Sequence, residues 1–332
     1  MTMTAAAAPL RTGPTSDLQR WATFAARRAG RLLISLWVLV TAAFLMIRLI
    51  PGDPVRAAMG QNASPEAIEA RRQALGLNDP FLVQYWDSLS GVFTGDLGSS
   101  IIAQVPVADT IAQRLPATFS LAALAFVIAV LVAVPLGVLM AVATRRGRRR
   151  RTELGFTTTS IFVASIPDFL LGVTLVYVFG VTLGVMPVAG RSGPESYVLP
   201  VIALALGPAA ILSRIVRVEM LTVLEADFVR TARAKRLKPW KVYLGHALPN
   251  AVTASLTVGA LILTSLVAGT VLVENVFAWP GLGSTIVQAI QTKDYAVVQG
   301  IVLVYGIGVL LINTIVDAVL AMLDPRTTIA NA

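Results

Sequence analysis

The chain has 332 residues, of which 56% are hydrophobic and only 14% are charged, and it contains no cysteine. This composition is typical of an integral membrane protein, argues against a single soluble core, and excludes disulfides, thiolate metal sites and cysteine nucleophiles. The formal net charge is +9, from 27 basic and 18 acidic residues. Nucleic-acid-binding proteins also carry such an excess, so the positions of the charges must decide whether this chain binds nucleic acid or lies in a membrane.

Six stretches of the chain approach the length of about 20 apolar residues that a helix needs to cross a hydrocarbon core of roughly 30 Å. They contain at most one charged residue each and lie at 32–50, 115–144, 156–186, 197–213, 251–273 and 295–322. The first holds Arg48, whose long side chain can reach the headgroups. A cleaved signal peptide is the alternative for this stretch, but its apolar part is too long and no clear cleavage site follows. We therefore predict an all-α integral membrane protein with six transmembrane helices.

Basic residues gather in every second segment between these stretches. Five precede the first stretch, six lie in 145–151 and eight lie in 214–241, whereas 51–114 has four basic against seven acidic residues. Because cytoplasmic loops carry the excess of Lys and Arg, both termini are predicted to be cytoplasmic and 51–114 extracytoplasmic. Topology and contact with anionic membrane lipid thus explain the positive charge, and no nucleic acid is needed as a partner.

Two segments outside the spans have a predictable structure. In 51–114, Ser64 suits a helix N-cap, Pro65 the first helical position and Gly76 the C-terminal end, so a short surface helix is expected there. Residues 1–26 are predicted to form a flexible cytoplasmic tail, which leaves 27–332 as the membrane domain.

The sequence offers little for catalysis. No Gly-Lys pair occurs, so the phosphate-binding loop G-x-x-x-x-G-K-[ST] is missing and the chain is not expected to be an ATPase. His246 is the only histidine, and no span carries a pair of carboxylates at ligand spacing. We therefore expect no catalytic residue, no metal site and no cofactor on this chain.

Asp168 and Asp317 lie inside predicted spans, where ionisable side chains are usually functional. Pro167 lacks the N–H that would bond to the carbonyl of Val163, so it should kink the third span and place Asp168 beside opened backbone near mid-membrane. Ser165, Pro167 and Asp168 are therefore candidates to border a translocation pathway. The pattern fits equally well an Asp168 that only caps the second half of a broken span. Asp317 is expected near the cytoplasmic end of the last span, with water or an arginine as its partner.

These two carboxylates also define an alternative function. A proton-coupled secondary transporter would use Asp168 and Asp317 as proton carriers. Such transporters are built from inverted repeats, and this sequence shows no convincing pair of matching halves.

The cytoplasmic segment 217–250, between the fourth and fifth spans, is amphipathic. Phe228, Val229 and Ala232 recur at helical spacing, and Pro239 suits the start of a second short helix. A helix, a turn and another helix are expected, too polar to span the membrane. Such a segment either lies on lipid or docks into a partner, and periodicity does not distinguish between the two.

A family resemblance favours docking. The stretch ARAKRLKPWKVYLGHALPNAV resembles the coupling motif of binding-protein-dependent ABC importer permeases, which reads E-A-A, three residues, Gly, nine residues, Ile, one residue, Leu-Pro. The stretches RLIPGDPVRAAMG, LGLNDPFLVQYW, TGDLGSSI, RLPATFSLA, SIPDF, DFVRTARAK and the terminal DPR are similar to the peptide/nickel subfamily of these permeases. The chain thus resembles the B-type permease subunit of a dipeptide or oligopeptide importer. In the motif, Arg230, Thr231 and Ala232 take the E-A-A positions, Arg236 the glycine, His246 the isoleucine, and Leu248 and Pro249 the closing pair.

The resemblance implies a six-helix permease in the bacterial inner membrane, with cytoplasmic coupling helices between spans four and five. It implies as partners a second homologous permease, two ATP-binding cassette ATPases that use ATP and Mg²⁺, and an extracytoplasmic substrate-binding protein. Dipeptides, oligopeptides, nickel chelates and glutathione are substrates within this family. The residues implied in ATPase coupling are Phe228, Val229, Arg230, Thr231, Ala232, Arg233, Ala234, Lys235, Arg236, Leu237, Leu248 and Pro249.

Two of these residues carry specific expectations. Arg236 departs from the family's glycine, so it must either adopt the left-handed conformation at a cost of about 1 kcal/mol or form another kind of turn. Ala232 is expected on the face that docks into the ATPase, where a Glu would bury a charge.

Overall fold

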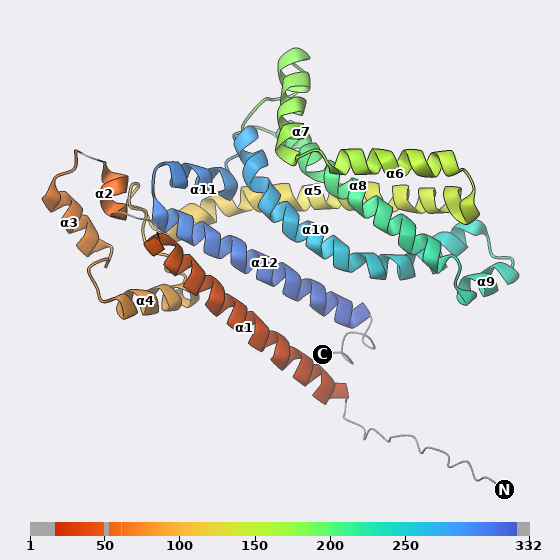
Figure 1. Ribbon diagram of the computed structural model, residues 1–332, viewed down its shortest axis with the longest axis horizontal. Helices are drawn as coiled ribbons and strands as arrows, with labels where there is room; N and C mark the ends of the chain where they lie inside the picture. Colours follow the sequence, from red (N-terminus) through yellow and green to blue (C-terminus); the bar gives the residue numbers. More distant parts are fainter. Residues whose placement is uncertain (1–16, 50–52, 61, 324–332) are drawn as a thin grey trace, which may run out of the picture.

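The computed structural model describes residues 17–49, 53–60 and 62–323, and these residues are mostly helical (Figure 1). The only β pairing within them is an isolated bridge between Ser99 and Pro106. The α-helices are α1 (Asp17–Leu49), α2 (Pro54–Met59), α3 (Pro65–Ala74), α4 (Phe81–Thr94), α5 (Val107–Thr144), α6 (Arg150–Ala164), α7 (Asp168–Leu175), α8 (Val198–Val223), α9 (Asp227–Ala234), α10 (Leu248–Val276), α11 (Leu282–Gln291) and α12 (Tyr295–Leu323). Short 3₁₀ segments, η1 (Arg145–Gly147) and η3 (Pro194–Tyr197), and π-helical segments, η2 (Val176–Thr182) and η4 (Lys241–Ala247), complete the list.

The centre of the bundle is the contact between α5 and α8. At Gly137 of α5, an added Cβ atom would lie 2.7 Å from the carbonyl oxygen of Ser213, so the two backbones are too close for a side chain there. Small residues permit such an approach between membrane helices, where lipid provides no hydrophobic drive for association. Small buried residues of α5 recur at every fourth position from Ala125 onward and are Ala125, Ala129, Ala133, Gly137 and Ala141.

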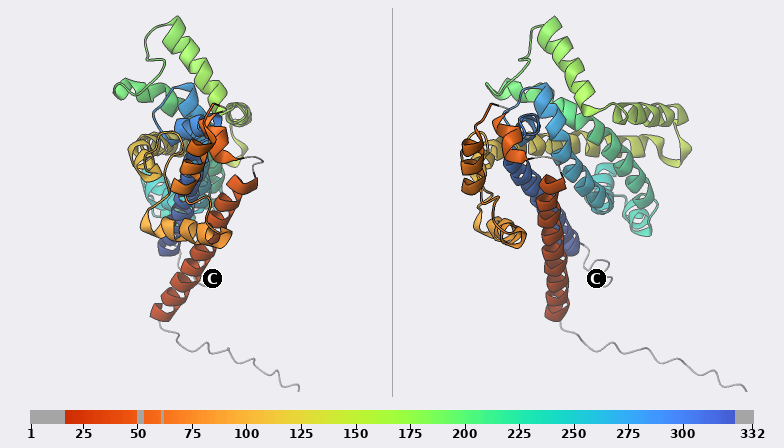
Figure 2. Two further views of the ribbon diagram at one scale, coloured as in Figure 1. Left: turned by 90° about the vertical axis from the view of Figure 1, so that its left-hand side faces the viewer. Right: turned by 60° about the vertical axis from the view of Figure 1, so that its left-hand side comes forward.

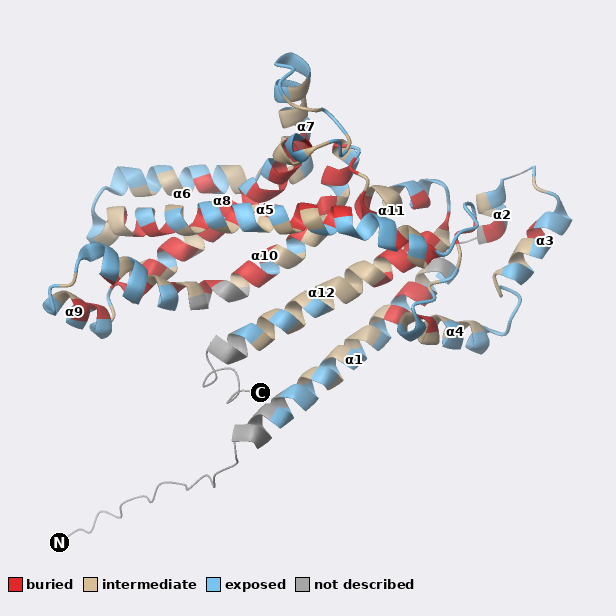
Figure 3. Ribbon diagram, turned by 180° about the vertical axis from the view of Figure 1, so that it is seen from behind, coloured by how far each residue is buried: buried red, intermediate tan, exposed pale blue. Residues whose placement is uncertain are grey.

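The other long helices pack around this pair. α10 contacts α8, α12 contacts α10, and α1 contacts α12. Buried residues concentrate on α5, α8 and α10, whereas α1 is exposed along much of its length (Figure 3). Ile34 is 64% exposed and Trp37 is 53% exposed, which suits a helix whose outer face meets hydrocarbon.

The third predicted span is broken. α6 and α7 meet at an angle of 89° across residues 165–167. The carbonyl of Val163 accepts from the N–H of Ile166 at 3.3 Å, in place of the bond that Pro167 cannot donate. α7 packs against α8 and α10, and its continuation η2 projects from the bundle in both views of Figure 2. The kink is thus confirmed, and the stretch predicted at 156–186 consists of two nearly perpendicular helical halves.

The bundle has two different ends (Figure 1). α2, α3 and α4 gather at one end, and α9 lies at the other, toward which the start of α1 and the described end of α12 also point. All connections predicted to be cytoplasmic therefore meet at one end of the molecule.

Among the described residues, five helices are long and apolar enough to cross a membrane, and the bent pair α6–α7 makes a sixth if it counts as one span. This confirms an all-α membrane fold with five or six spans. α8 continues to Val223, so residues 217–223 of the predicted cytoplasmic segment are helical, and α5 begins at Val107, before the second predicted stretch.

The predicted surface helix is present as α3. Ser64 accepts the N–H of Ala67 at 3.2 Å, and Gly76 follows the helix in the left-handed conformation with φ of 62°. Residues 17–26, predicted as part of a flexible tail, are the first turns of α1. The rest of that tail, 1–16, and the terminal DPR motif lie outside the described residues.

Candidate functional site

α9 is anchored to the bundle along one face. Val229 is fully buried and Ala232 is 7% exposed, and both belong to the main hydrophobic core. Leu237, just after the helix, packs against the same core, as does the fully buried Ala247 of η4. A helix of only eight residues is marginal in isolation, so this packing is what holds α9 in place.

α9 ends in a Schellman motif. The N–H of Leu237 donates to the carbonyl of Ala232 at 3.4 Å, and the N–H of Arg236 donates to the carbonyl of Arg233 at 2.9 Å. Arg236 itself has φ of 54°, in the left-handed region. Of the two alternatives for the residue at the family's glycine position, the structure therefore shows the left-handed turn, and not another kind of turn.

The opposite face of α9 is open. Phe228 is 46% exposed, and Arg230 pairs only with Asp227 on the same helix, at 3.1 Å. Thr231, Ala234, Lys235 and Arg236 are also exposed. The expectation that Ala232 lies on this face is wrong, because Ala232 is turned toward the core of its own chain.

No separate second helix follows the turn. The helix that starts at Pro239 continues without interruption through the π-helical η4 into α10. Trp240 and Leu244 are exposed on it, with 58% and 52% of their surface accessible. The closing residues of the motif, Leu248 and Pro249, are therefore the first turn of the fifth membrane helix.

An ion pair joins three helices at this end of the bundle. Arg217 of α8 donates to Glu153 of α6 at 2.7 Å and to the hydroxyl of Thr144, at the end of α5, at 2.9 Å. Arg145 donates to the carbonyl of Leu224, which follows α8, at 3.2 Å. Sequence reasoning counted Arg217 and Arg145 only as topology charges and missed that they tie the helices next to α9 together.

The break in the third span brings Ser165, Pro167 and Asp168 together. Ser165 and Pro167 are exposed, while Asp168 at the start of α7 lies against α8 and α10. A Cβ atom added at Gly269 would lie 3.3 Å from a carboxylate oxygen of Asp168, a tight contact, whereas one at Gly207 would lie at an ordinary 3.6 Å. None of the salt bridges in the described part of the chain involves Asp168.

Asp317 has a different environment. It forms an ion pair with Arg28, which joins α12 to α1. The expected arginine partner is thereby confirmed, and this pairing favours a structural role for Asp317.

Glu274 is an interior carboxylate that directly follows the predicted apolar stretch 251–273. It is fully buried near the end of α10, where it accepts from the Thr118 hydroxyl of α5 at 2.6 Å. It also accepts the N–H groups of Gly283 and Ser284, in the first turn of α11, at 2.7 and 3.1 Å. The glycine-rich turn after it, WPGLGS, was the signal that a helix N-terminus needed an acceptor.

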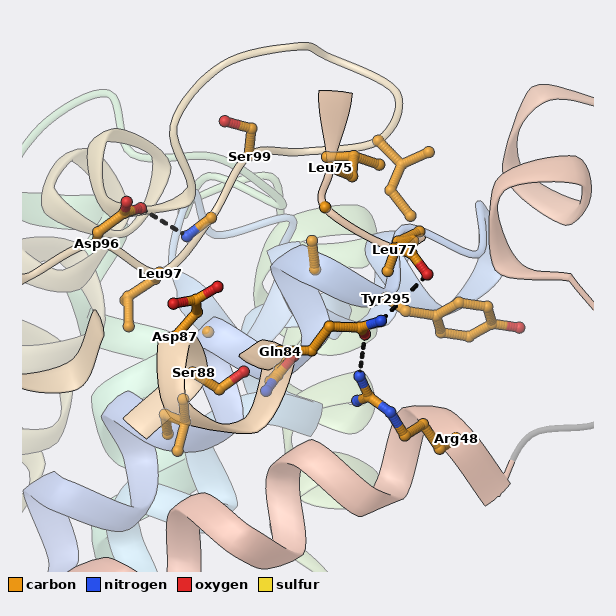
Figure 4. A pocket seen from close by; sticks show the side chains of 17 residues that line it. Arg48, Leu75, Leu77, Gln84, Asp87, Ser88, Asp96, Leu97, Ser99 and Tyr295 are labelled. Atoms are coloured by element: carbon orange, nitrogen blue, oxygen red, sulfur yellow. Dashed lines mark hydrogen bonds between the residues drawn. The ribbon is translucent and has the colours of Figure 1, made fainter. Parts of the chain in front are cut away.

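A pocket of about 320 Å³ opens at the other end of the bundle, beside α4 and the start of α12 (Figure 4). Arg48 lies over the ring of Phe44, with 3.5 Å to its centroid, and donates to Gln84. Asp87 and Asp96 line the same pocket. Part of the acidic excess of segment 51–114 is therefore displayed on a concave surface.

The described residues contain no group of three or more His, Cys, Asp or Glu side chains that could hold a metal ion. The candidate functional features are thus a docking surface at one end, a broken span with an interior carboxylate, and a concave surface at the other end.

Comparison with known proteins identifies the family of the chain. Residues 133–329 match the binding-protein-dependent transport system inner membrane component family, and residues 22–122 match the N-terminal family of such membrane components. The chain belongs to this permease family. It is 38% identical over 308 residues to a protein of Brucella suis biovar 1 named as a peptide transport system permease, covering 90% of this chain and 97% of that one. These matches place it among the inner-membrane permeases of peptide-type ABC importers.

Further comparisons find another transport permease and solved structures with a similar fold. The permease is 36% identical over 299 residues to the glutathione transport system permease protein of Escherichia coli strain K12, covering 90% of this chain and 96% of the relative. Its fold is similar to a chain of the inward-facing MetNI methionine ABC transporter, with a TM-score of 0.52 at 21% identity, over 64% of this permease and 96% of that chain. A second crystal form of MetNI gives a TM-score of 0.53 at 19% identity.

Proposed function

We propose that this permease is the B-type subunit of a peptide importer and that α9, with the turn at Arg236, couples it to partner ATPases. The observation that carries the proposal is the two-sided environment of α9. One side is locked into the core through Val229 and Ala232, and the other presents Phe228 and Arg230 to a partner. A helix held in this way transmits a push as a rigid element.

A displacement of α9 would be transmitted to the spans along the chain. The helix from Pro239 leads through Leu248 and Pro249 directly into α10, and Arg217 links α8 to α5 and α6 at the same end. Movement of α9 would therefore reach the fifth span through covalent continuity and the other spans through the ion pair. The remaining coupling residues of the motif, Arg233, Ala234 and Lys235, lie on α9 or at its end.

The partners proposed are a second permease, two ATPases that bind ATP and Mg²⁺, and an extracytoplasmic binding protein. The permease itself binds no cofactor in this proposal. Both termini are cytoplasmic, and the end that carries α2, α3 and α4 faces the binding protein. Short peptides are the proposed substrates, since relatives are named for transport of peptides and of glutathione.

The break at Ser165, Pro167 and Asp168 is proposed to border the translocation pathway. An interior carboxylate between α8 and α10 without a cation in the described residues can attract the ammonium group of a peptide. The same residue is the carrier in the alternative proposal, a proton-coupled transporter, although Asp317 is already paired with Arg28.

Co-purification distinguishes the two functions. The full chain, tagged at its C-terminus and extracted in mild detergent, should bring a second permease and P-loop ATPases with it. Transport by the chain alone, without ATP, would contradict the importer and make Asp168 the residue to mutate.

Substitutions then test the docking face. We expect Phe228→Glu to leave the permease folded but to weaken ATPase binding by a factor of ten or more, because a central contact of an interface is typically worth about 2 kcal/mol. Ala232→Glu should instead lower the yield of folded permease, because its carboxylate enters the core. Retention of ATPases by Phe228→Glu would count against docking through this face.

A further inference from the structure

A cavity of about 820 Å³ lies between α5 and α8 and is lined by none of the residues proposed for coupling or for the translocation pathway. Its volume is within the range of small-molecule sites, roughly 300–1,000 Å³. Leu124 and Ile128 of α5 form one wall, and Val201 and Ile202 of α8 form the other. These walls are wholly aliphatic.

Arg191 lies at the mouth of this cavity. Its guanidinium group lies 5.6 Å from the ring centroid of Tyr197 and 5.9 Å from that of Trp279, and the two rings form an edge-to-face pair. The preceding residue, Gly190, donates its N–H to the carbonyl of Phe277 at 2.8 Å, which ties the loop to the end of α10. The loop that carries Arg191 is thus held to the bundle, and the exposed Arg191 side chain lies near both rings.

Arg191 forms no salt bridge with the described residues. The carboxylate of Glu195, on the same loop, lies against Gly193, which lines the cavity, but Glu195 itself is not among the lining residues. The hydroxyl of Ser192 lies at the same mouth. The cavity therefore has a positively charged polar rim and an apolar interior.

The change from a polar rim to an apolar interior matches the change from headgroups to hydrocarbon in a bilayer. The rim is in the loop before α8, at headgroup level, and Ile202 lies about 6 Å deeper than Val198 at the helical rise of about 1.5 Å per residue. Leu124 is 43% exposed and Leu131, two turns further along α5, is 62% exposed, so the apolar wall continues toward the membrane centre.

We propose that this cavity binds one anionic phospholipid, with the phosphate at Arg191 and an acyl chain between α5 and α8. Basic positions at the edge of membrane helices attract anionic headgroups, and aliphatic walls suit an acyl chain. A zwitterionic peptide is disfavoured because the lining residues supply a cation but no carboxylate for its ammonium group. The proposal concerns lipid and does not rest on the transport function.

The test is native mass spectrometry of the purified complex after delipidation, titrated with phosphatidylglycerol or with phosphatidylcholine of the same acyl chains. Wild type should take up one phosphatidylglycerol per permease with about five- to tenfold preference, the effect of about 1 kcal/mol for one basic residue. Arg191→Gln should abolish the preference, and Arg191→Lys should retain most of it.

Two controls complete the design. Lys293→Gln removes an exposed positive charge that does not line the cavity and should leave the preference unchanged. Ile202→Trp fills the cavity without changing charge and should reduce binding of both lipids. Equal binding of the two lipids by wild type, an unchanged preference in Arg191→Gln, or displacement of the lipid by a dipeptide would each overturn the proposal.

Discussion

Arg236 shows how one residue can depart from a family pattern without changing the local fold. Its positive φ and the two hydrogen bonds of the Schellman motif reproduce the helix end that glycine would form. The cost is steric, since Cβ crowds the backbone in the left-handed region. The packing of Leu237 and Ala232 against the core offsets that cost.

We therefore predict that Arg236→Gly stabilises the end of α9 by about 1 kcal/mol and leaves ATPase coupling intact. Hydrogen exchange of the α9 amides would report the stabilisation, and substrate-stimulated ATPase activity would report coupling. Arg236→Ala is the matched control, because it removes the charge but keeps Cβ. Loss of coupling in both variants would mean that the guanidinium group contacts the ATPase.

Asp53 is expected to make the segment 51–114 sensitive to acid. Burial raises the pKa of this carboxyl, but hydrogen bonds from Arg72 and from the N–H groups of Val55 and Arg56 outweigh burial and leave the pKa below its ordinary value of 3.8. Since the carboxylate form is favoured in the folded state, the stability it contributes is complete well above pH 3.8 and is lost as pH falls through the lowered pKa.

Hydrogen exchange of α2 and α3 should show this dependence. Protection in wild type, corrected for intrinsic rates, should fall below about pH 4, while Asp53→Asn should be less protected at neutral pH and nearly independent of pH. Asp79→Asn, a control in the same segment, should behave like wild type. A pH dependence that persists in Asp53→Asn would assign the effect to another group.

At the scale of elements, buried polar contacts decide how the helices near Glu274 join. This carboxylate connects α5, α10 and the first turn of α11, and the Thr118 hydroxyl that donates to it also accepts the N–H of Leu282 at 2.8 Å. Such a network is stabilising only while every member is satisfied.

Thr118→Val should therefore destabilise the permease by about 1–3 kcal/mol, because it removes a bond to a charged group and leaves the Leu282 N–H unpaired. Thermal unfolding in detergent would measure the change. Thr174→Val is a matched control, since that exposed hydroxyl bonds only to the carbonyl of Leu170 in its own helix, at 2.9 Å. Equal stability of the two variants would contradict a structural role for the network.

At the scale of the whole molecule, the two ends of the bundle have different chemistry. The end with α9 collects the basic loops, and the end with α2, α3 and α4 holds the acidic pocket lined by Asp87 and Asp96. Because cytoplasmic segments carry the positive excess, this polarity predicts the orientation in the membrane.

Single-cysteine variants can measure that orientation, since the chain has no cysteine of its own. In intact cells, a membrane-impermeant maleimide should label Gln73→Cys on α3, whereas Lys235→Cys after α9 should react only once the membrane is permeabilised. The cysteine-free chain provides the background. The reverse pattern would invert the topology and remove the basis for ATPase coupling.

The sequence by itself determined the membrane class, most of the spans, the kink at Pro167, the helix that begins at Pro65, and the family. These features depend on local composition and backbone chemistry: an uncharged run, a missing N–H or a capping hydroxyl acts on its own neighbours wherever the chain is packed.

Only the tertiary structure decided which side of a helix is covered. Ala232 and Phe228 both belong to the amphipathic α9, yet one faces the core and the other is exposed. The sequence places Glu274 just outside an apolar stretch, but in the structure α5 and α11 supply its hydrogen-bond donors. The sequence counts Arg217 among the basic residues of a predicted cytoplasmic segment, but in the structure it binds Thr144 and Glu153. Periodicity shows that one face of a helix is apolar. The residues that cover this face come from elsewhere in the chain or from another chain, so a local sequence pattern does not identify them.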